Sequence, residues 1–164
     1  MGYIGSYIWS LRQHVGHRRL LVPGAQVLLV DEEGRALFQQ RADNGLWEIP
    51  AGACEEGGDF ADAAVREVKE ETGLVVRRED LVPFASLSDP EVHTLTYPNG
   101  DVTHCFALCF AARTWSGELS PGLDEVRQAG FHPFDRAPQP LLPSTAVVLE
   151  MFREFTATGR FQAR

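Results

Sequence analysis

The sequence predicts an α/β or α+β fold, in which a mixed β-sheet is covered by helices on its faces. Stretches with helical spacing and stretches with extended patterns are interspersed, without the regular strand–helix–strand alternation of a purely parallel sheet. Hydrophobic residues make up 44% of the 164 residues, and no repeat, linker or low-complexity tract divides the chain. We therefore expect a single domain over residues 1–164.

The first element expected is an amphipathic N-terminal helix over about residues 3–15, added to the core of the domain. Its helical spacing is carried by Ile4, Tyr7, Ile8, Leu11 and Val15. If the side that bears Ile4, Ile8 and Leu11 is not covered by the same subunit, it would pack against a second chain. A homodimer is therefore one expectation.

The strands follow from apolar runs bounded by turn sequences. The largely apolar run at residues 25–30 predicts a buried strand, and the turn at 31–34 predicts a hairpin with a strand at 35–40. A short extended segment at 46–49 precedes Pro50. Further strands are expected at 82–87, 92–97, 102–112 and 130–134. The turn sequence at 98–101 predicts that the strands on its two sides are antiparallel.

Two more helices are expected. Asp59 is a plausible N-cap for a helix that ends near Thr72, with Asp62 completing an imperfect capping box and Gly73 as the stop. Its buried stripe would be Ala61, Ala64, Val65 and Val68. After a proline-rich loop at 138–143, the last helix begins near Ser144. One face of it should pack on a sheet through Val147, Val148, Met151, Phe152 and Phe155.

Charge and cysteine usage limit the partners and the compartment. With 15 Lys and Arg against 23 Asp and Glu, the net charge of -8 would repel a nucleic-acid backbone, so we expect no nucleic-acid partner. An acidic protein can still bind a phosphorylated small molecule through a bridging cation. No apolar stretch is long enough to span a membrane, and three cysteines without a C-x-x-C pair favour a reducing, cytoplasmic setting.

Three carboxylates form the most informative cluster. Glu67, Glu70 and Glu71 stand at i, i+3 and i+4, so all three project from one face of the predicted helix. They repel one another, and they lie in the C-terminal half, where the helix dipole disfavours negative charge. A hard divalent cation would turn this repulsion into coordination. The alternative is an ordinary solvated face, with Asp62 and Arg66 as an i, i+4 pair.

Residues 52–74 resemble the Nudix box, G-x5-E-x7-R-E-U-x-E-E-x-G-U, where U is a bulky aliphatic residue. The matching positions are Gly52, Arg66, Glu67, Val68, Glu70, Glu71, Gly73 and Leu74. The first glutamate of the pattern falls on Gly58, and Asp59 or Glu56 would have to substitute for it. The order and spacing of the strands from about residue 22 to 134 also resemble the α/β/α sandwich of the family.

The resemblance implies metal-dependent hydrolysis of a diphosphate bond in a nucleoside diphosphate derivative, with Mg²⁺ or Mn²⁺ as cofactor. It implies that Glu67, Glu70 and Glu71 bind the metal, that the Gly52 carbonyl joins them, and that Arg66 orients Glu67. Members of the family take the general base either from the position of Glu67 or from a later loop. Glu125 is the candidate in that loop and Asp124 the second. The other interpretation is that these two acids only solvate a turn.

The substrate is the least determined feature. Arg41 could hold a phosphate or form a surface ion pair. Trp47 could stack on a nucleobase, but an aromatic residue in a short strand more often belongs to the core, which is the favoured interpretation. The stretch at 47–52 resembles the entry to the box in sugar-nucleotide and ADP-ribose hydrolases, which slightly favours those substrates over nucleoside triphosphates and dinucleoside polyphosphates. The alternative function is a Nudix-fold module that binds a nucleotide without turnover, a hypothesis that Gly58 motivates.

Overall fold

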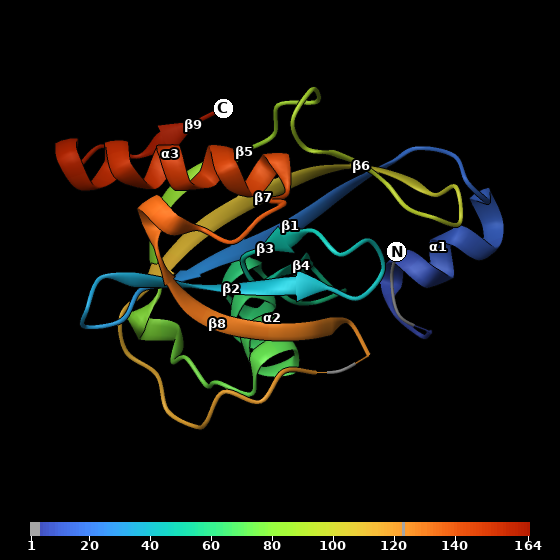
Figure 1. Ribbon diagram of the computed structural model, residues 1–164. Helices are drawn as coiled ribbons and strands as arrows, with labels where there is room; N and C mark the ends of the chain where they lie inside the picture. Colours follow the sequence, from blue (N-terminus) through green and yellow to red (C-terminus); the bar gives the residue numbers. More distant parts are fainter. Residues whose placement is uncertain (1–3, 123) are drawn as a thin grey trace.

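A computed structural model describes residues 4–122 and 124–164 (Figure 1). Its helices are α1 (Tyr7–Val15), α2 (Phe60–Thr72) and α3 (Pro143–Thr158), with 3₁₀ turns η1 (Arg78–Asp80) and η2 (Phe134–Arg136). Its strands are β1 (Leu20–Leu29), β2 (Arg35–Arg41), β3 (Trp47–Glu48), β4 (Ala51–Ala53), β5 (Val82–Leu87), β6 (Thr94–Thr96), β7 (Val102–Ala112), β8 (Val126–Pro133) and β9 (Gln162–Ala163). The predicted mixture of strands and helices is confirmed.

The strands form two sheets. A six-stranded mixed sheet has the order β4-β1-β7-β5-β9, with β6 also paired to β7, and a three-stranded antiparallel sheet has the order β3-β2-β8. The long parallel pairing of β1 with β7 runs from Leu20 opposite Thr103 to Leu29 opposite Ala112. The antiparallel pairing of β6 with β7 around the turn at 98–101 is confirmed.

The hairpin expected between residues 25–30 and 35–40 forms at its turn, but the two strands do not pair along their length. The chain does turn at 31–34, where Asp31 N–H donates to the Arg35 carbonyl, but only the isolated bridge between Val30 and Ala36 links the two strands. Each strand is central in its own sheet, because β1 lies between β4 and β7 while β2 lies between β3 and β8.

Two hydrophobic clusters lie on opposite sides of these strands. One contains Leu28 and Phe38 and is covered by α3, and the other contains Val27 and Leu37 and is covered by α2. Successive side chains of a strand point to opposite faces, so β1 and β2 are buried on both sides. Figure 1 shows α3 and α2 on the two sides of the sheets.

The N-terminal helix begins at Tyr7 and not at residue 3. Ser6 is the N-cap, its hydroxyl accepting a hydrogen bond from Trp9 N–H, and Gly5 precedes it with a φ of 94° that ends helical geometry. Residues 1–3 lie outside the described part of the chain. Ile4 is exposed, whereas Ile8 is only 4% exposed and packs within the same chain. Ile8 is therefore not available to a second chain as expected, and dimerisation stays a prediction.

The box helix α2 agrees with its prediction at both ends. The Asp59 side chain accepts from Ala61 and Asp62 N–H, Asp62 completes the capping box, and Gly73 ends the helix in the left-handed conformation. Ala64 and Val68 are buried as expected, but Ala61 and Val65 are only partly buried, and Ala63 takes a buried place instead. Glu67 and Glu71 are buried on this helix as well.

Several strand limits differ from the prediction. The first strand begins at Leu20, β6 is shorter than the expected 92–97, β8 begins at Val126 and not at 130, and β9 has no counterpart in the sequence patterns. Residues 20–24 include Pro23 and Gly24, which are poor strand formers, yet β7 imposes the extended conformation on them. Within the described residues, no helix is long and apolar enough to cross a membrane.

Candidate active site

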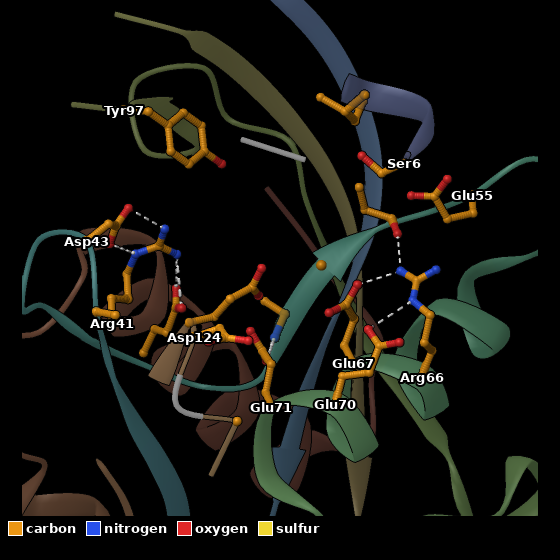
Figure 2. A pocket seen from close by; sticks show the side chains of 18 of the residues that line it. Ser6, Arg41, Asp43, Glu55, Arg66, Glu67, Glu70, Glu71, Tyr97 and Asp124 are labelled. Atoms are coloured by element: carbon orange, nitrogen blue, oxygen red, sulfur yellow. Dashed lines mark hydrogen bonds and ion pairs between the residues drawn. The ribbon is translucent and has the colours of Figure 1, made fainter. Parts of the chain in front are cut away.

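A cavity of about 610 Å³ opens where the last turns of α2 meet β4 and the loop before β8. Its lining includes Gly52, Glu67, Glu70 and Glu71, the four positions expected to bind metal. Arg66, Asp124 and Glu125 also line it. Figure 2 shows the three glutamates of α2 rising toward the same space, with Arg66 beside them. The structure therefore brings together residues that the box spreads over 23 positions and a distant loop.

Arg66 connects the helix to strand β4. Its Nη2 donates to Glu67 Oε1 at 2.5 Å and to the Ala53 carbonyl at 2.6 Å, and its Nε lies 3.7 Å from Glu70 Oε2. The guanidinium is thereby fixed between the backbone of one element and the acids of another. It holds Glu67 in a defined orientation, which is the geometry that the family resemblance implies.

Gly52 has a steric reason to be glycine. A Cβ placed there would lie 1.9 Å from Glu67 Oε1 and 2.0 Å from its carboxyl carbon, so any side chain would expel the carboxylate. Gly24 on the neighbouring strand is constrained in the same way, because its Cβ would lie 2.5 Å from the Gly52 carbonyl oxygen. The backbone of β4 is therefore shaped to let a carboxylate approach the Gly52 peptide.

Glu67 and Glu71 carry an excess of buried negative charge. The pKa of Glu71 is raised well above its ordinary value, first by burial and then by the charges of Glu48 and Glu67, although Ala51 N–H donates to Glu71 Oε2 at 3.0 Å. Burial also raises the pKa of Glu67, Arg66 lowers it in part, and Glu70 and Glu125 raise it further. A cation would be strongly favoured here.

Glu48 is a site residue that the sequence analysis missed. It is 5% exposed, lines the cavity, and its burial raises its pKa against the opposing effect of Arg41. The sequence signal was a charged residue between Trp47 and Ile49, both of which are buried. Burying a single charged residue in a strand lowers the stability of the fold unless the charge is paired, so an acid at such a position indicates a functional site.

Arg41 forms ion pairs with two carboxylates, those of Glu48 and Asp43. Its Nη1 lies 3.0 Å from both oxygens of Glu48, while Nε and Nη2 donate to Asp43 at 2.9 and 2.8 Å. Burial alone would lower the pKa of Arg41, but these two acids more than reverse that effect. Arg41 lines the cavity as the phosphate-binding hypothesis requires, and it would have to exchange one carboxylate for a phosphate.

The loop before β8 is fastened to the end of α2. Ser120 N–H donates to the Thr72 carbonyl at 2.8 Å and Gly122 N–H to the Glu71 carbonyl at 3.1 Å. These bonds satisfy carbonyls that a helix end leaves unpaired. Gly122 permits the close approach, since a Cβ there would lie 2.5 Å from the Glu70 carbonyl oxygen. The loop thereby carries Asp124 and Glu125 to the cavity.

Trp47 does not have the position expected of a base-stacking residue. It is 8% exposed, lies edge-on to His132 with ring centroids 5.8 Å apart, belongs to the cluster under α3, and is not among the residues that line the cavity. Its placement fits the core interpretation, because no ring face is available to a ligand. Among the described residues, Tyr97, just after β6, is the aromatic residue that lines the cavity, and no sequence pattern singled it out.

The position of the missing box glutamate is not sterically restricted. A Cβ at Gly58 would come no closer than 3.5 Å to another heavy atom. Asp59, one expected substitute, is occupied as the N-cap and by an ion pair with Arg78, and Glu56, the other, is exposed and outside the cavity lining. Glu55 is the acid of this loop that lines the cavity, and its Oε2 accepts from Tyr7 N–H at 2.8 Å.

The sequence profile described as the NUDIX domain matches residues 20–153, most of the chain. The chain belongs to the Nudix family. The match begins after α1. Several residues that match the Nudix box also line the cavity, namely Gly52, Arg66, Glu67, Glu70 and Glu71.

Individual relatives and solved structures agree with the family. The chain is 27% identical over 128 residues to an ADP-ribose pyrophosphatase of Methanocaldococcus jannaschii, covering 76% of this chain and 70% of that protein. It is 31% identical over 128 residues to a putative ADP-ribose pyrophosphatase of Bacillus subtilis, covering 77% of this chain and 58% of the relative. The crystal structure of an ADP-ribose pyrophosphatase from Streptococcus suis superposes with a TM-score of 0.64 at 25% identity, covering 87% and 97% of the two chains. These similarities support hydrolase activity on pyrophosphate bonds.

Proposed function

We propose that this Nudix protein hydrolyses a diphosphate bond in a nucleoside diphosphate derivative and uses Mg²⁺ or Mn²⁺ to do so. The observation that carries the proposal is the convergence of Glu67, Glu70 and Glu71 with the Gly52 backbone on one cavity. Two of these acids are buried although burial raises their pKa, and a bound cation would offset the cost of keeping both ionised.

The donor set fits a hard divalent cation. All the groups are oxygen donors, and Gly52 leaves its peptide open to the site because it lacks a side chain. The three carboxylates line one cavity, but among the described residues no three His, Cys, Asp or Glu side chains are already close enough together to hold a metal ion. Glu70 has room to adjust, because its side chain is 54% exposed. Once bound, the ion would supply charge neutralisation at the phosphates and activation of water.

The protein's own residues would orient the reaction and move the proton. Water oxygen attacks one phosphorus, the bridging P–O bond breaks, and two monophosphate-bearing products form. Arg66 holds the Glu67 carboxylate by a 2.5 Å hydrogen bond, which makes Glu67 one candidate to accept the water proton. Glu125 is the other candidate, because it lines the same cavity and its charge acts on Glu67.

We favour ADP-ribose or a sugar nucleotide over a nucleoside triphosphate or a dinucleoside polyphosphate. Support comes from the named activities of the relatives with similarity over about 128 residues. The cavity volume of about 610 Å³ lies within the usual range for small-molecule sites of about 300–1,000 Å³.

The second candidate function, nucleotide binding without turnover, rests on Gly58. The structure offers Glu55 in place of the absent box glutamate, but the Glu55 carboxylate accepts a hydrogen bond from the first turn of α1. The complete set of Glu67, Glu70 and Glu71 favours the enzyme.

The test is a product assay with Mg²⁺ or Mn²⁺ and a panel of ADP-ribose, sugar nucleotides, nucleoside triphosphates and dinucleoside polyphosphates. Wild type, Glu70→Gln and Glu150→Gln are compared, because Glu150 is an exposed glutamate on α3 and serves as a matched control. We expect metal-dependent cleavage by wild type and Glu150→Gln, with loss in Glu70→Gln. Metal-assisted binding of one of these compounds without any product would overturn the proposed hydrolase activity and support nucleotide binding without turnover.

A further inference from the structure

A second, smaller hollow of about 90 Å³ adjoins the active-site cavity. Both spaces are lined by Arg41, Glu48, residues 51–53 and Tyr97, so the two lie side by side. The residues that line only the smaller hollow carry no acid; they are uncharged polar and apolar, among them Gln26, His93, Ser144, Thr145, Leu95 and Leu142. One buried water needs about 10–15 Å³, so the hollow has room for a flat group of several heavy atoms.

Two polar atoms beside this hollow lack a partner. Gln26 Oε1 and Ser144 Oγ are buried, and no group in the described part of the chain forms a hydrogen bond with either. Their residues are 5% and 1% exposed. Leaving a buried polar atom unpaired costs about 1–3 kcal/mol, so both atoms call for a ligand or for water.

His93 fixes which atom Gln26 presents. His93 Nδ1 lies 3.2 Å from the Leu87 carbonyl, which can only accept, so Nδ1 carries the proton. His93 Nε2 is then an acceptor, and it lies 3.0 Å from Gln26 Nε2, which donates to it. Burial lowers the pKa of His93 and keeps the ring neutral.

The orientation of Gln26 is therefore determined by the network. A flipped amide would place its oxygen against the His93 Nε2 lone pair, and the imidazole cannot change tautomer without losing the bond to Leu87. Gln26 Oε1 consequently remains an acceptor, and a bound group must bring an N–H or O–H donor to satisfy it.

We propose that this hollow receives the nucleobase of the substrate and selects a base with an exocyclic amino group, which donates to Gln26 Oε1. The proposal rests on the hydrolase function proposed above. A diphosphate held by the acids of α2 would place the attached nucleoside beside Tyr97, at the junction of the two spaces. Figure 2 shows Tyr97 across the cavity from the three glutamates.

The experiment compares ADP-ribose with the analogue whose base is unsubstituted purine, which lacks only the amino group. We expect wild type to show a kcat/KM about five- to a hundredfold higher for ADP-ribose, the range that one unsatisfied buried group produces. In Gln26→Met the ratio of the two kcat/KM values should fall toward one, because kcat/KM for ADP-ribose decreases. Gln128→Met, a matched change at an exposed glutamine of β8, should keep the preference.

Calorimetric binding of AMP and purine riboside monophosphate separates this proposal from the hydrolase proposal, because neither ligand has a diphosphate to cleave. Tighter binding of AMP by wild type supports the amino-selective hollow even if no substrate is turned over. Equal binding and equal kcat/KM within each pair, or a preference that survives in Gln26→Met, would overturn it. Equal values for wild type would overturn the proposal even if Gln26→Met does not fold.

Discussion

The two ends of α2 use acidic residues in opposite ways. At the N-terminal end, Asp59 and Asp62 cap the helix, lie where its dipole favours negative charge, and form ion pairs with Arg78. The pKa of Asp59 is lowered, first by its hydrogen bond from Arg78 and then by backbone N–H groups. These acids stabilise the helix, and both are exposed.

At the C-terminal end, Glu67, Glu70 and Glu71 lie where the dipole disfavours them. Glu67 and Glu71 are 8% and 6% exposed, and the pKa of each is raised, first by burial. The two clusters look alike as acidic stretches of one sequence. They differ in position on the helix and in burial, and the pKa is lowered for Asp59 but raised for Glu67 and Glu71. Those differences distinguish acids that stabilise the fold from acids that await a cation.

The largest expected contrast is in activity. Glu67→Gln removes a carboxylate that Arg66 holds at the cavity, and we expect kcat/KM to fall by at least about a hundredfold, as when a group that stabilises a transition state is removed. Asp62→Asn at the other end should change kcat/KM by less than about threefold, because Asp62 does not line the cavity. Steady-state kinetics on the same metal and substrate measures both. Equal losses would contradict the division of α2 into two ends.

The next contrast is in stability. Asp59→Ala removes the hydrogen bonds to Ala61 and Asp62 N–H together with the ion pair to Arg78, and should lower Tm by a few degrees while activity persists. Thermal denaturation followed by circular dichroism measures it. An unchanged Tm would show that the cap contributes nothing.

A smaller effect is expected from pH. The pKa of Glu71 is raised above 4.5, so ionised Glu71 destabilises the metal-free fold at pH values above its folded pKa, and this destabilisation disappears as the pH falls through that value. The lowered pKa of Asp59 acts in the opposite sense, because its stabilisation is present above 3.8 and is lost as the pH falls through its folded pKa.

The sign of this pH effect is tested by comparing a Glu71 variant with wild type at each pH, because other groups titrate as well and their contributions cancel in the difference. The Tm difference between Glu71→Gln and wild type, both with chelator, should shrink as the pH is lowered from 8 toward 5. A difference that grows on acidification would contradict the assignment of a raised pKa to Glu71.

The smallest expected effect concerns the missing box glutamate. Gly58→Glu should fold normally, because a Cβ at this position meets no atom closer than 3.5 Å and Gly58 does not have a positive φ. We expect a gain in activity of up to a fewfold, or an increase in metal affinity, measured by metal titration of the rate. A loss of stability would show that this loop requires glycine.

The sequence predicted α2 well and its surroundings less well. The limits of α2, its capping box and the shared face of Glu67, Glu70 and Glu71 depend on local spacing and capping, and the structure confirms them. Trp47 and the hairpin depend on which strands become neighbours, which local patterns do not determine. Glu48 and Tyr97 join the site only because β3 and β6 end at the same cavity.

The central claim is that the C-terminal end of α2 is a cation site whose acids destabilise the empty protein. The most direct test is the Tm of wild type and Glu71→Gln, each with chelator and with saturating Mg²⁺ or Mn²⁺. Gln can still accept from Ala51 N–H, so the variant should be more stable than wild type with chelator, and wild type should gain more on adding metal. A variant that is less stable with chelator, together with equal or absent gains from metal, would contradict the claim.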